Sequence, residues 1–425
     1  MSRISAPRLL ALGAFAFLLR GGMSYATSVA PILPAYNYAD ATSVDDWARA
    51  TITARKKGTD IPDFSSTSHR LQVEFLISIY SVFGESPLAA KLIHAATGAA
   101  SCVLLAAALS PLFGAASALV SAVLLAAWPS AVFGSSQILK DPLVNFFAYT
   151  ALWALLPLLG REKVDGARTR ATLGATTLVL AGCFRSYIMI ILAASFAAAA
   201  LWSLRRGRPG ARAALVAAVL TPGLYVGFSH ALFSQLFQSK AYAANATSMQ
   251  IQVIPKTYDP TQTRYIIPIS PLGITEFRMV RQAEDQKWSI YHEHRVIATQ
   301  IYPDARFKSW LDVAVFIPKA SFQVLFMPLP GLYPIDGKMG RLVTAGENII
   351  LLLLAVAAAL GIRRLPLNPP RAALLGVFLC MTIGSALLEF DLGSATRHKA
   401  FYFPMLFPFA AAALLGRRRV PEAYR

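Results

Sequence analysis

Carboxylate side chains with the potential for acid–base chemistry stand at two places in the sequence. Asp40 opens the polar stretch DATSVDDWARATITAR after a long apolar run, and Asp45 and Asp46 follow in the same stretch. Asp141 lies in SSQILKDPLVNFF, directly after Lys140, where one apolar run ends and the next begins. We take Asp40 and Asp141 as the first candidates for a reacting site, with Asp45 and Asp46 as substitutes for Asp40.

Further ionisable residues occupy similar places at the ends of apolar runs. Arg185 lies in CFRSY between two runs, Glu347 opens a later run, and Arg397, His398 and Lys399 precede the last one. Ionisable groups at membrane depth cost free energy and therefore indicate function by default. A single charge at a helix end is more often an anchor that reaches the interface, and Asp40 by itself could be a helix N-cap. The functional interpretation depends on these residues forming one carboxylate-and-cation site.

The composition shows what surrounds these residues. Of the 425 residues, 56% are hydrophobic and only 15% are charged, and the mean hydropathy is +0.51. Soluble domains have about 45–50% apolar and about 25% charged residues. The chain is therefore predicted to be an all-α integral membrane protein, and Cys102, Cys183 and Cys380 are too few for a disulfide framework.

About ten transmembrane helices are expected from the apolar runs, because a bilayer core needs about 20 apolar residues per helix. The runs are Leu9–Thr27, Leu88–Leu109, Ala115–Phe133, Leu143–Leu159, Ala171–Phe184, Tyr187–Leu204, Ala213–Phe233, Val343–Ile362, Ala372–Phe390 and Phe401–Leu415. The first run could be read as a cleavable signal peptide. We expect it to be retained as a helix, because Arg20 interrupts the approach to a cleavage site.

The basic residues of the short loops predict the orientation. With both termini inside, the inner segments hold 17 Lys and Arg and three acidic residues, which accounts for +14 of the formal net charge of +18. Such a bias sets the orientation of membrane proteins, so the charge does not indicate a nucleic-acid partner. Two long loops, at 28–87 and 233–342, then lie outside. In the second loop the apolar stretch Trp310–Pro330 is interrupted by charges and prolines and is expected to be interfacial or re-entrant.

Several motifs follow one another in an order that resembles a known family. The first outer stretch has the motif Asp-Ala-x-x-(aromatic or apolar)-x-x-x-Ala-Arg, formed by Asp40, Ala41, Val44, Ala48 and Arg49. The later stretch AAWPSAVFGSSQILKDPLVNFF resembles a turn that contains Pro-Ser followed by an acidic residue, Pro and Leu. The later pieces are GCFRSY, MPLPGLYP with GEN, and RHKAFYFPMLFPFAAAALLG. This series resembles the GT-C superfamily of membrane glycosyltransferases, which includes protein O-mannosyltransferases, the aminoarabinose transferase of lipid A and exopolysaccharide-cluster enzymes.

The resemblance implies an inverting glycosyltransferase that uses a polyprenyl-phosphate sugar and a glycan, lipid or protein acceptor. In that scheme Asp40 is the general base on the acceptor hydroxyl, and Asp141 orients a cation or the acceptor. Cations bind the leaving lipid phosphate, for which the candidates are Arg185, Lys140, Arg397 and His398, with Glu347 as a further substrate-binding residue. The expected location is the bacterial cytoplasmic membrane, with the site facing the periplasm. No cofactor is expected and no metal is indicated.

Two other functions remain open. An O-antigen polymerase or ligase would place essential basic residues in a late outer loop, as His292, His294 and Arg295 do, although the Asp-bearing first loop argues against it. A transporter or flippase would have charges in mid-bilayer and related halves, and neither is visible. The expected division is a catalytic module at 1–232, the second outer loop at 233–342, and the last transmembrane helices at 343–425.

Overall fold

The computed structural model describes most of the chain, namely residues 4–33, 38–59, 67–160, 164–236, 253–255, 263–265, 270–291, 300–333, 339–389 and 391–416. It forms two compact units. Unit 1 comprises Met1–Thr247, Leu354–Val377 and Pro404–Arg425, and unit 2 comprises Ser248–Leu353 and Phe378–Phe403. The boundaries at 232 and 342 that the sequence predicts are not tested by this division and stay a prediction.

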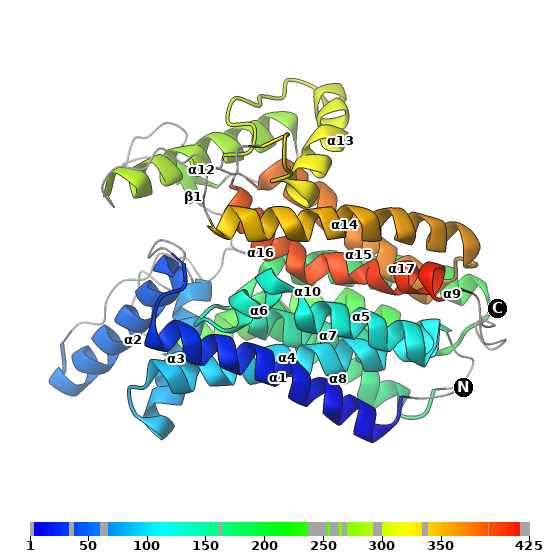
Figure 1. The fold of residues 1–425 in the computed structure, drawn as a ribbon, viewed down its shortest axis with the longest axis horizontal. Coiled ribbons are helices and arrows are strands. Elements are labelled where there is room, and N and C mark those ends of the chain that lie inside the picture. The colour runs from blue at the N-terminus through cyan, green and yellow to red at the C-terminus, as the bar shows by residue number, and fades with distance from the viewer. Residues whose placement is uncertain are drawn as a thin grey trace. The chain divides into compact units, whose positions relative to one another are not determined.

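Unit 1 is a helical bundle, and in Figure 1 the helices of its N-terminal segment run from blue to green while its last helix is red. Its helices are α1 (Ala6–Val29), α2 (Ala39–Lys57), α3 (Thr67–Phe83), α4 (Pro87–Phe113), α5 (Ala115–Ala127), α6 (Pro129–Ser135), α7 (Asp141–Gly160), α8 (Ala167–Phe184), α9 (Ser186–Arg205), α10 (Gly210–Leu236) and α17 (Phe407–Leu414). The boundary between the units falls within α14 (Met339–Arg364) and α15 (Pro369–Leu388).

Unit 2 holds the second long loop and parts of the last helices. Two three-residue strands, β1 (Val253–Pro255) and β2 (Thr263–Tyr265), pair antiparallel. The helices are α12 (Pro271–Tyr291), α13 (Trp310–Phe326) and α16 (Leu392–Tyr402), which leads into the 3-10 turn η2 (Phe403–Met405). Within the described residues, the all-α expectation is therefore confirmed apart from this strand pair.

Seven of the described helices are long and apolar enough to cross a membrane. They are α1, α4, α7, α9, α10 up to Ser229, α14 and α15, and the bent pair α5 and α6 gives an eighth if it counts as one span. The chain is thus a helical membrane protein with several spans. The predicted runs Ala171–Phe184 and Phe401–Leu415 correspond to α8 and to the stretch ending in α17, which do not meet this criterion. The count of ten stays a prediction.

The predicted run Ala115–Phe133 is not straight but bends by 63° between α5 and α6. Pro129 has no N–H and opens α6, so carbonyls at the end of α5 lose helical partners. Arg20 of α1 is fully buried and donates to two of these carbonyls, Leu125 O (3.2 Å) and Ala126 O (2.8 Å). The arginine that interrupts the first apolar run therefore stabilises a helix break.

Two more residues of α1 continue this contact toward the C-terminal end of the helix. Ser24 Oγ donates to Ser136 O (3.2 Å), and Thr27 Oγ1 accepts from Gln137 Nε2 (3.1 Å). Arg20, Ser24 and Thr27 are spaced so that they share one face of the helix. This face of α1 fixes the segment that leads from α6 to Asp141.

Candidate functional site

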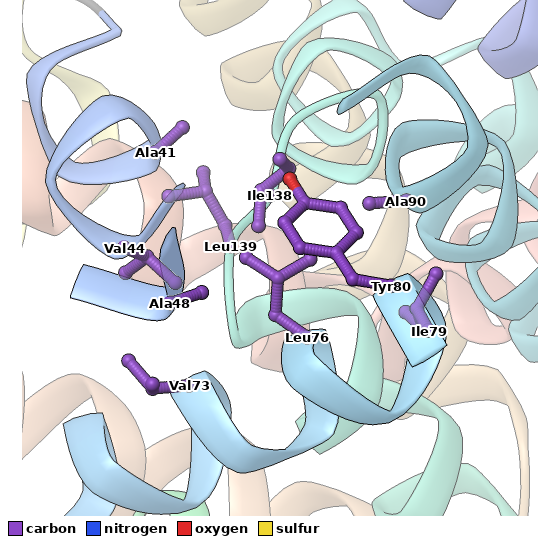
Figure 2. Packing of buried hydrophobic residues seen from close by; sticks show 10 residues of the cluster. All are labelled: Ala41, Val44, Ala48, Val73, Leu76, Ile79, Tyr80, Ala90, Ile138 and Leu139. Atoms are coloured by element: carbon purple, nitrogen blue, oxygen red, sulfur yellow. The ribbon is translucent and has the colours of Figure 1, made fainter. Parts of the chain in front are cut away.

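A buried apolar cluster supports the carboxylates of the first outer loop. Figure 2 shows side chains of α2, α3, α4 and the segment before α7 packed together, with Leu76 and Leu139 between the α2 residues and Tyr80. The members are Ala41, Val44, Ala48, Val73, Leu76, Ile79, Tyr80, Ala90, Ile138 and Leu139. Three of the motif residues, Ala41, Val44 and Ala48, thus have a packing role at helical spacing. Because Val44 and Leu139 belong to this cluster, it packs the residues adjacent to Asp45 and to Lys140 against each other.

Asp45 on α2 is held by side chains of α2 and α3. The Tyr80 hydroxyl donates to Asp45 Oδ1, and Arg49 Nε lies 3.2 Å from both carboxylate oxygens. Arg49 also donates to the side chain and the carbonyl of Glu85 (3.3 and 3.2 Å). Burial and the Asp45 carboxylate raise the pKa of Tyr80 well above its usual value, so its hydroxyl stays a donor. Asp45 is therefore part of a network that ties α2 to α3.

Asp40 and Asp46 differ from Asp45 because both side chains are exposed. Asp40 is the second residue of α2, and the N-cap position belongs to Tyr38, so the alternative that Asp40 is the N-cap is wrong. A carboxylate in the first turn still interacts favourably with the helix dipole. The exposed position leaves Asp40 accessible to a substrate.

Lys91 is a residue of this region that the sequence analysis missed. Its ammonium group donates to Thr27 Oγ1 (3.4 Å) and Ser28 Oγ (3.1 Å) at the end of α1, and its charge is attracted to the Asp45 carboxylate. The available signal was a lysine inside the expected run Leu88–Leu109, just after its start. Lys91 adds a cation where α4 contacts the end of α1, within electrostatic reach of Asp45 on α2.

The structure brings together Asp141 and Arg185, two candidates that lie 44 residues apart in the chain. Arg185 Nη2 lies 2.5 Å from Asp141 Oδ1, and Arg185 Nη1 donates to the Tyr187 hydroxyl (3.0 Å). Arg185 has extended backbone angles (φ −149°, ψ 90°), which separates α8 from α9 and places its side chain at the junction. The two groups are only 10% and 17% exposed. This is an ion pair at the start of a membrane-crossing helix.

The segment before Asp141 is bound by α3 as well as by α1. Gln72 of α3 donates to Ile138 O (3.0 Å), while Gln137 contacts Thr27. Lys140, half-buried, is the last residue of this segment. A set of hydrogen bonds thus runs from Lys91 through Thr27 to Gln137, three residues before Lys140, and Lys91 is attracted electrostatically to Asp45. We refer to Asp40, Asp45, Lys91, Lys140, Asp141 and Arg185 as the unit 1 polar group.

Unit 2 contains the remaining candidates, and they have different surroundings. Glu347 is buried on α14. Its neighbour Asn348 accepts from Lys399 Nζ (2.6 Å) and donates to Pro328 O (3.0 Å). Lys399 also donates to Leu325 O (3.1 Å), and only 2% of it is exposed. The contacts of Lys399 serve to join α13, α14 and α16.

His398 and Arg397 lie on α16 beside Lys399. The His398 ring, at Nδ1, pairs with the Glu389 carboxylate, and Arg397 is half-buried. The main chain of Glu389 is held in turn by Arg278 of α12, a fully buried residue that sequence reasoning missed. We refer to Glu347, Asn348, Glu389, Arg397, His398 and Lys399 as the unit 2 polar group.

Arg278 donates to four main-chain carbonyls, which explains its burial. The acceptors are Ile301 O (2.6 Å), Tyr302 O (2.8 Å), Leu387 O (3.1 Å) and Glu389 O (3.3 Å). Burial, with a smaller contribution from Arg306, lowers the pKa of Arg278 to about 10, so the group stays charged at neutral pH. Arg278 therefore links α12 to the end of α15.

Metal ligation finds no support among the described residues, where no group of three or more His, Cys, Asp or Glu side chains could hold an ion. His292, His294 and Arg295, the residues of the polymerase or ligase alternative, lie outside the described residues. Of the three cysteines, Cys102 and Cys183 are buried and Cys380 is exposed, and all are free.

The chain was compared with protein-family models, curated proteins and solved structures. No protein-family model matches the chain. No curated protein matches it either. Among solved structures, the chain is similar to the crystal structure of ArnT from Cupriavidus metallidurans bound to undecaprenyl phosphate, with 14% identity and a TM-score of 0.35 over 96% of this chain and 76% of that one. A likeness of this degree identifies neither an activity nor corresponding residues.

Proposed function

We propose that the chain is an inverting glycosyltransferase that moves a sugar from a polyprenyl-phosphate donor to a glycan, lipid or protein acceptor at the outer face of the cytoplasmic membrane. The observation that carries this proposal is the unit 1 polar group. It combines accessible and partly buried carboxylates with three cations at the ends of membrane-crossing helices. The order of motifs that resembles the GT-C superfamily supports the same reaction.

The proposed reaction needs one base and a stabilised leaving group. The acceptor hydroxyl oxygen attacks the anomeric carbon while Asp40 takes the hydroxyl proton. The bond between the anomeric carbon and the phosphate oxygen breaks, and the lipid phosphate leaves with the electron pair. A single displacement inverts the anomeric configuration. Asp40 is proposed for the base role because its side chain is exposed to an incoming acceptor, whereas Asp45 is half-buried and held by Arg49 and Tyr80.

Cations of the unit 1 polar group are proposed to bind the lipid phosphate. Charge-assisted hydrogen bonds to phosphate are about twice as strong as neutral ones, and arginine can bind in a bidentate manner. Arg185 is the first candidate, since Asp141 holds its guanidinium at a helix junction (2.5 Å). Lys140 and Lys91 are further candidates. Arg397 and His398 stay proposals as well, and Glu347 is more simply explained by its burial beside Lys399.

The experiment for this proposal is donor turnover by the purified chain in nanodiscs. A panel of polyprenyl-phosphate hexoses and pentoses is supplied with membrane extract as acceptor, and release of free polyprenyl phosphate is measured. We expect release with at least one sugar, and a product of inverted configuration by NMR. If no member of the panel binds or turns over, the proposed function is wrong.

The orientation is tested separately by cysteine labelling in intact cells, in a background with Cys380→Ser. Thr53→Cys on α2 and Asp304→Cys before α13 are exposed positions in the two long loops. An impermeant maleimide is expected to label both without lysis. Arg206→Cys, in a short loop with an inner charge bias, is expected to need lysis. Labelling of Arg206→Cys alone would reverse the proposed topology.

A further inference from the structure

Helix α13 has two apolar faces, and only one of them is covered within unit 2. Val313 on the inner face packs with Ile274 and Phe307, and Phe316 and Ile317 contribute to the same cluster. The outward face carries Trp310, Leu311, Val315 and Phe322, of which 60%, 72%, 71% and 40% are exposed. Ala314 and Pro318 fill the same stripe, and Lys319 stands at its edge. An exposed stripe of large apolar side chains indicates a contact with a partner or a membrane.

The C-terminal end of α13 is fixed against a membrane-crossing helix. Pro328, two residues after α13, accepts a hydrogen bond from Asn348 of α14 (3.0 Å). Lys399 donates both to Leu325 O in the last turn of α13 and to Asn348 Oδ1. These contacts place the end of α13 at the level that Asn348 has along α14.

The position of Asn348 along α14 indicates how deep the end of α13 lies in the membrane. The 26 residues of α14 span about 39 Å, which exceeds the hydrocarbon core of about 30 Å, and its apolar run starts at Val343. Asn348 follows Val343 by five residues, so it lies roughly 7 Å inside the apolar part at about 1.5 Å per residue. Side chains of α14 around this level also point outward, namely Leu342, Val343, Ile349, Ile350 and Leu353. The end of α13 therefore lies at a depth where lipid surrounds the protein.

The N-terminal end of α13 has the features of the water side of the interface. Ser309 and Asp312 form a capping box, with Ser309 Oγ accepting from Asp312 N (3.2 Å) and Asp312 Oδ2 accepting from Ser309 N (2.9 Å). Arg306 and Lys308 just before the helix are exposed and suit anionic lipid phosphates. Trp310 opens the helix, and tryptophan is enriched at the headgroup level of membranes. At 17 residues, or about 25 Å, α13 is too short to cross the core.

We propose that α13 is an interfacial helix whose outward face, formed by Trp310, Leu311, Val315 and Phe322, binds the phospholipids of the outer leaflet. The helix enters obliquely, with Trp310 among the headgroups and Phe322 deeper. The depth inferred from Asn348 agrees with the roughly 5–10 Å to which interfacial helices bury their apolar faces. The contact anchors unit 2 to the membrane and does not depend on the chemistry proposed for unit 1.

The test is depth measurement by electron paramagnetic resonance in bilayers of phosphatidylethanolamine and phosphatidylglycerol. A nitroxide is attached to Leu311→Cys, Val315→Cys or Phe322→Cys, each in a Cys380→Ser background, since the other two cysteines are buried. Collision with oxygen and with a water-soluble nickel chelate reports the depth of each label. Asp304→Cys serves as the aqueous control and Ile350→Cys, on the outward side of α14, as the membrane control.

We expect the three α13 labels to be shielded from the nickel chelate and open to oxygen, at depths of about 5–10 Å that increase from Leu311 to Phe322. Free access of the chelate to all three would place the face in water and overturn the proposal. Shielding from both reagents with an immobilised spectrum would show that protein, such as a second copy, covers the face. A label near the bilayer centre would show that α13 spans. Either of these results also overturns the proposal.

Discussion

The two polar groups look alike in the sequence but have different surroundings in the structure. In the unit 1 polar group the charged side chains contact mainly other side chains and stay partly exposed, as Asp45 with Arg49 and Asp141 with Arg185 do. Arg20, elsewhere in unit 1, is instead buried against main-chain carbonyls. In unit 2, Lys399 of the polar group and the nearby Arg278 are fully buried. Arg278 donates to main-chain carbonyls, and Lys399 donates to Leu325 O and to the Asn348 side chain. His398 and Glu389 form a partly exposed pair like those of unit 1, so the contrast concerns the two buried cations. A cation whose donors are used by carbonyls of its own chain stabilises the fold. A cation paired with a partly exposed carboxylate can exchange that partner for a ligand.

The largest expected effect is on the reacting carboxylate of unit 1. General-base catalysis contributes about 100- to 10,000-fold, so Asp40→Asn is expected to lower sugar transfer by that factor with normal expression and folding. Asparagine keeps the shape of the side chain, and Asp40 is exposed, so the fold is spared. Asp45→Asn and Asp46→Asn are compared in the same assay. If one of these abolishes transfer while Asp40→Asn is fully active, the assignment of the base moves to that residue.

A comparable effect, on stability instead of turnover, is expected from the buried cation of unit 2. Lys399→Met leaves Asn348 Oδ1 and Leu325 O without this donor and removes the positive charge beside Glu347. Breaking a buried charged contact costs about 3–5 kcal/mol, which thermal unfolding in nanodiscs would detect. Lys308→Met, at an exposed position, is the control and is expected to change stability by less than about 0.5 kcal/mol. A stable Lys399→Met protein that fails to bind donor would assign Lys399 to a binding site and remove the contrast between the units.

Arg185→Ala is expected to have an intermediate effect. Loss of a charge-assisted contact to the lipid phosphate costs about 1.5–3 kcal/mol, or roughly tenfold or more in donor affinity. Donor binding in nanodiscs measures the change, and Asp141→Asn tests whether the partner carboxylate positions the guanidinium. Unchanged affinity and turnover in Arg185→Ala would reduce Arg185 to an anchor at the junction of α8 and α9.

The smallest expected effect tests whether the contact between Tyr80 and Asp45 is structural or takes part in the reaction. Tyr80→Phe removes the hydroxyl that donates to Asp45, which costs about 0.5–1.5 kcal/mol of stability. Sugar transfer is expected to change little, because Asp45 keeps its contacts with Arg49. A loss of transfer as large as that expected for Asp40→Asn would instead show that the Asp45 and Tyr80 pair takes part in the reaction.

Local patterns in the sequence were sufficient for the membrane character and for most helices. The length of an apolar run is a property of consecutive residues, so α1, α4, α7 and α14 could be located from composition alone. The role of Arg20 was not predictable in this way. The sequence shows an arginine within an apolar run, whereas its partners at Leu125 and Ala126 lie more than 100 residues away.

The sequence by itself located the ionisable residues beside the apolar runs, because each such position follows from the residues next to it. Asp141 and Arg185 do lie at helix ends, whereas Glu347 lies two turns inside α14 and Lys399 lies within α16. Only the tertiary structure decided which of these residues are buried against the main chain and which form partly exposed ion pairs. Burial and hydrogen-bond partners depend on segments distant in the chain, as in the contact of Lys399 with Leu325 and the pair of Arg185 with Asp141. Lys91 and Arg278 were missed for the same reason. Their charge is visible in the sequence, but the free energy of placing that charge depends on what the fold packs around it.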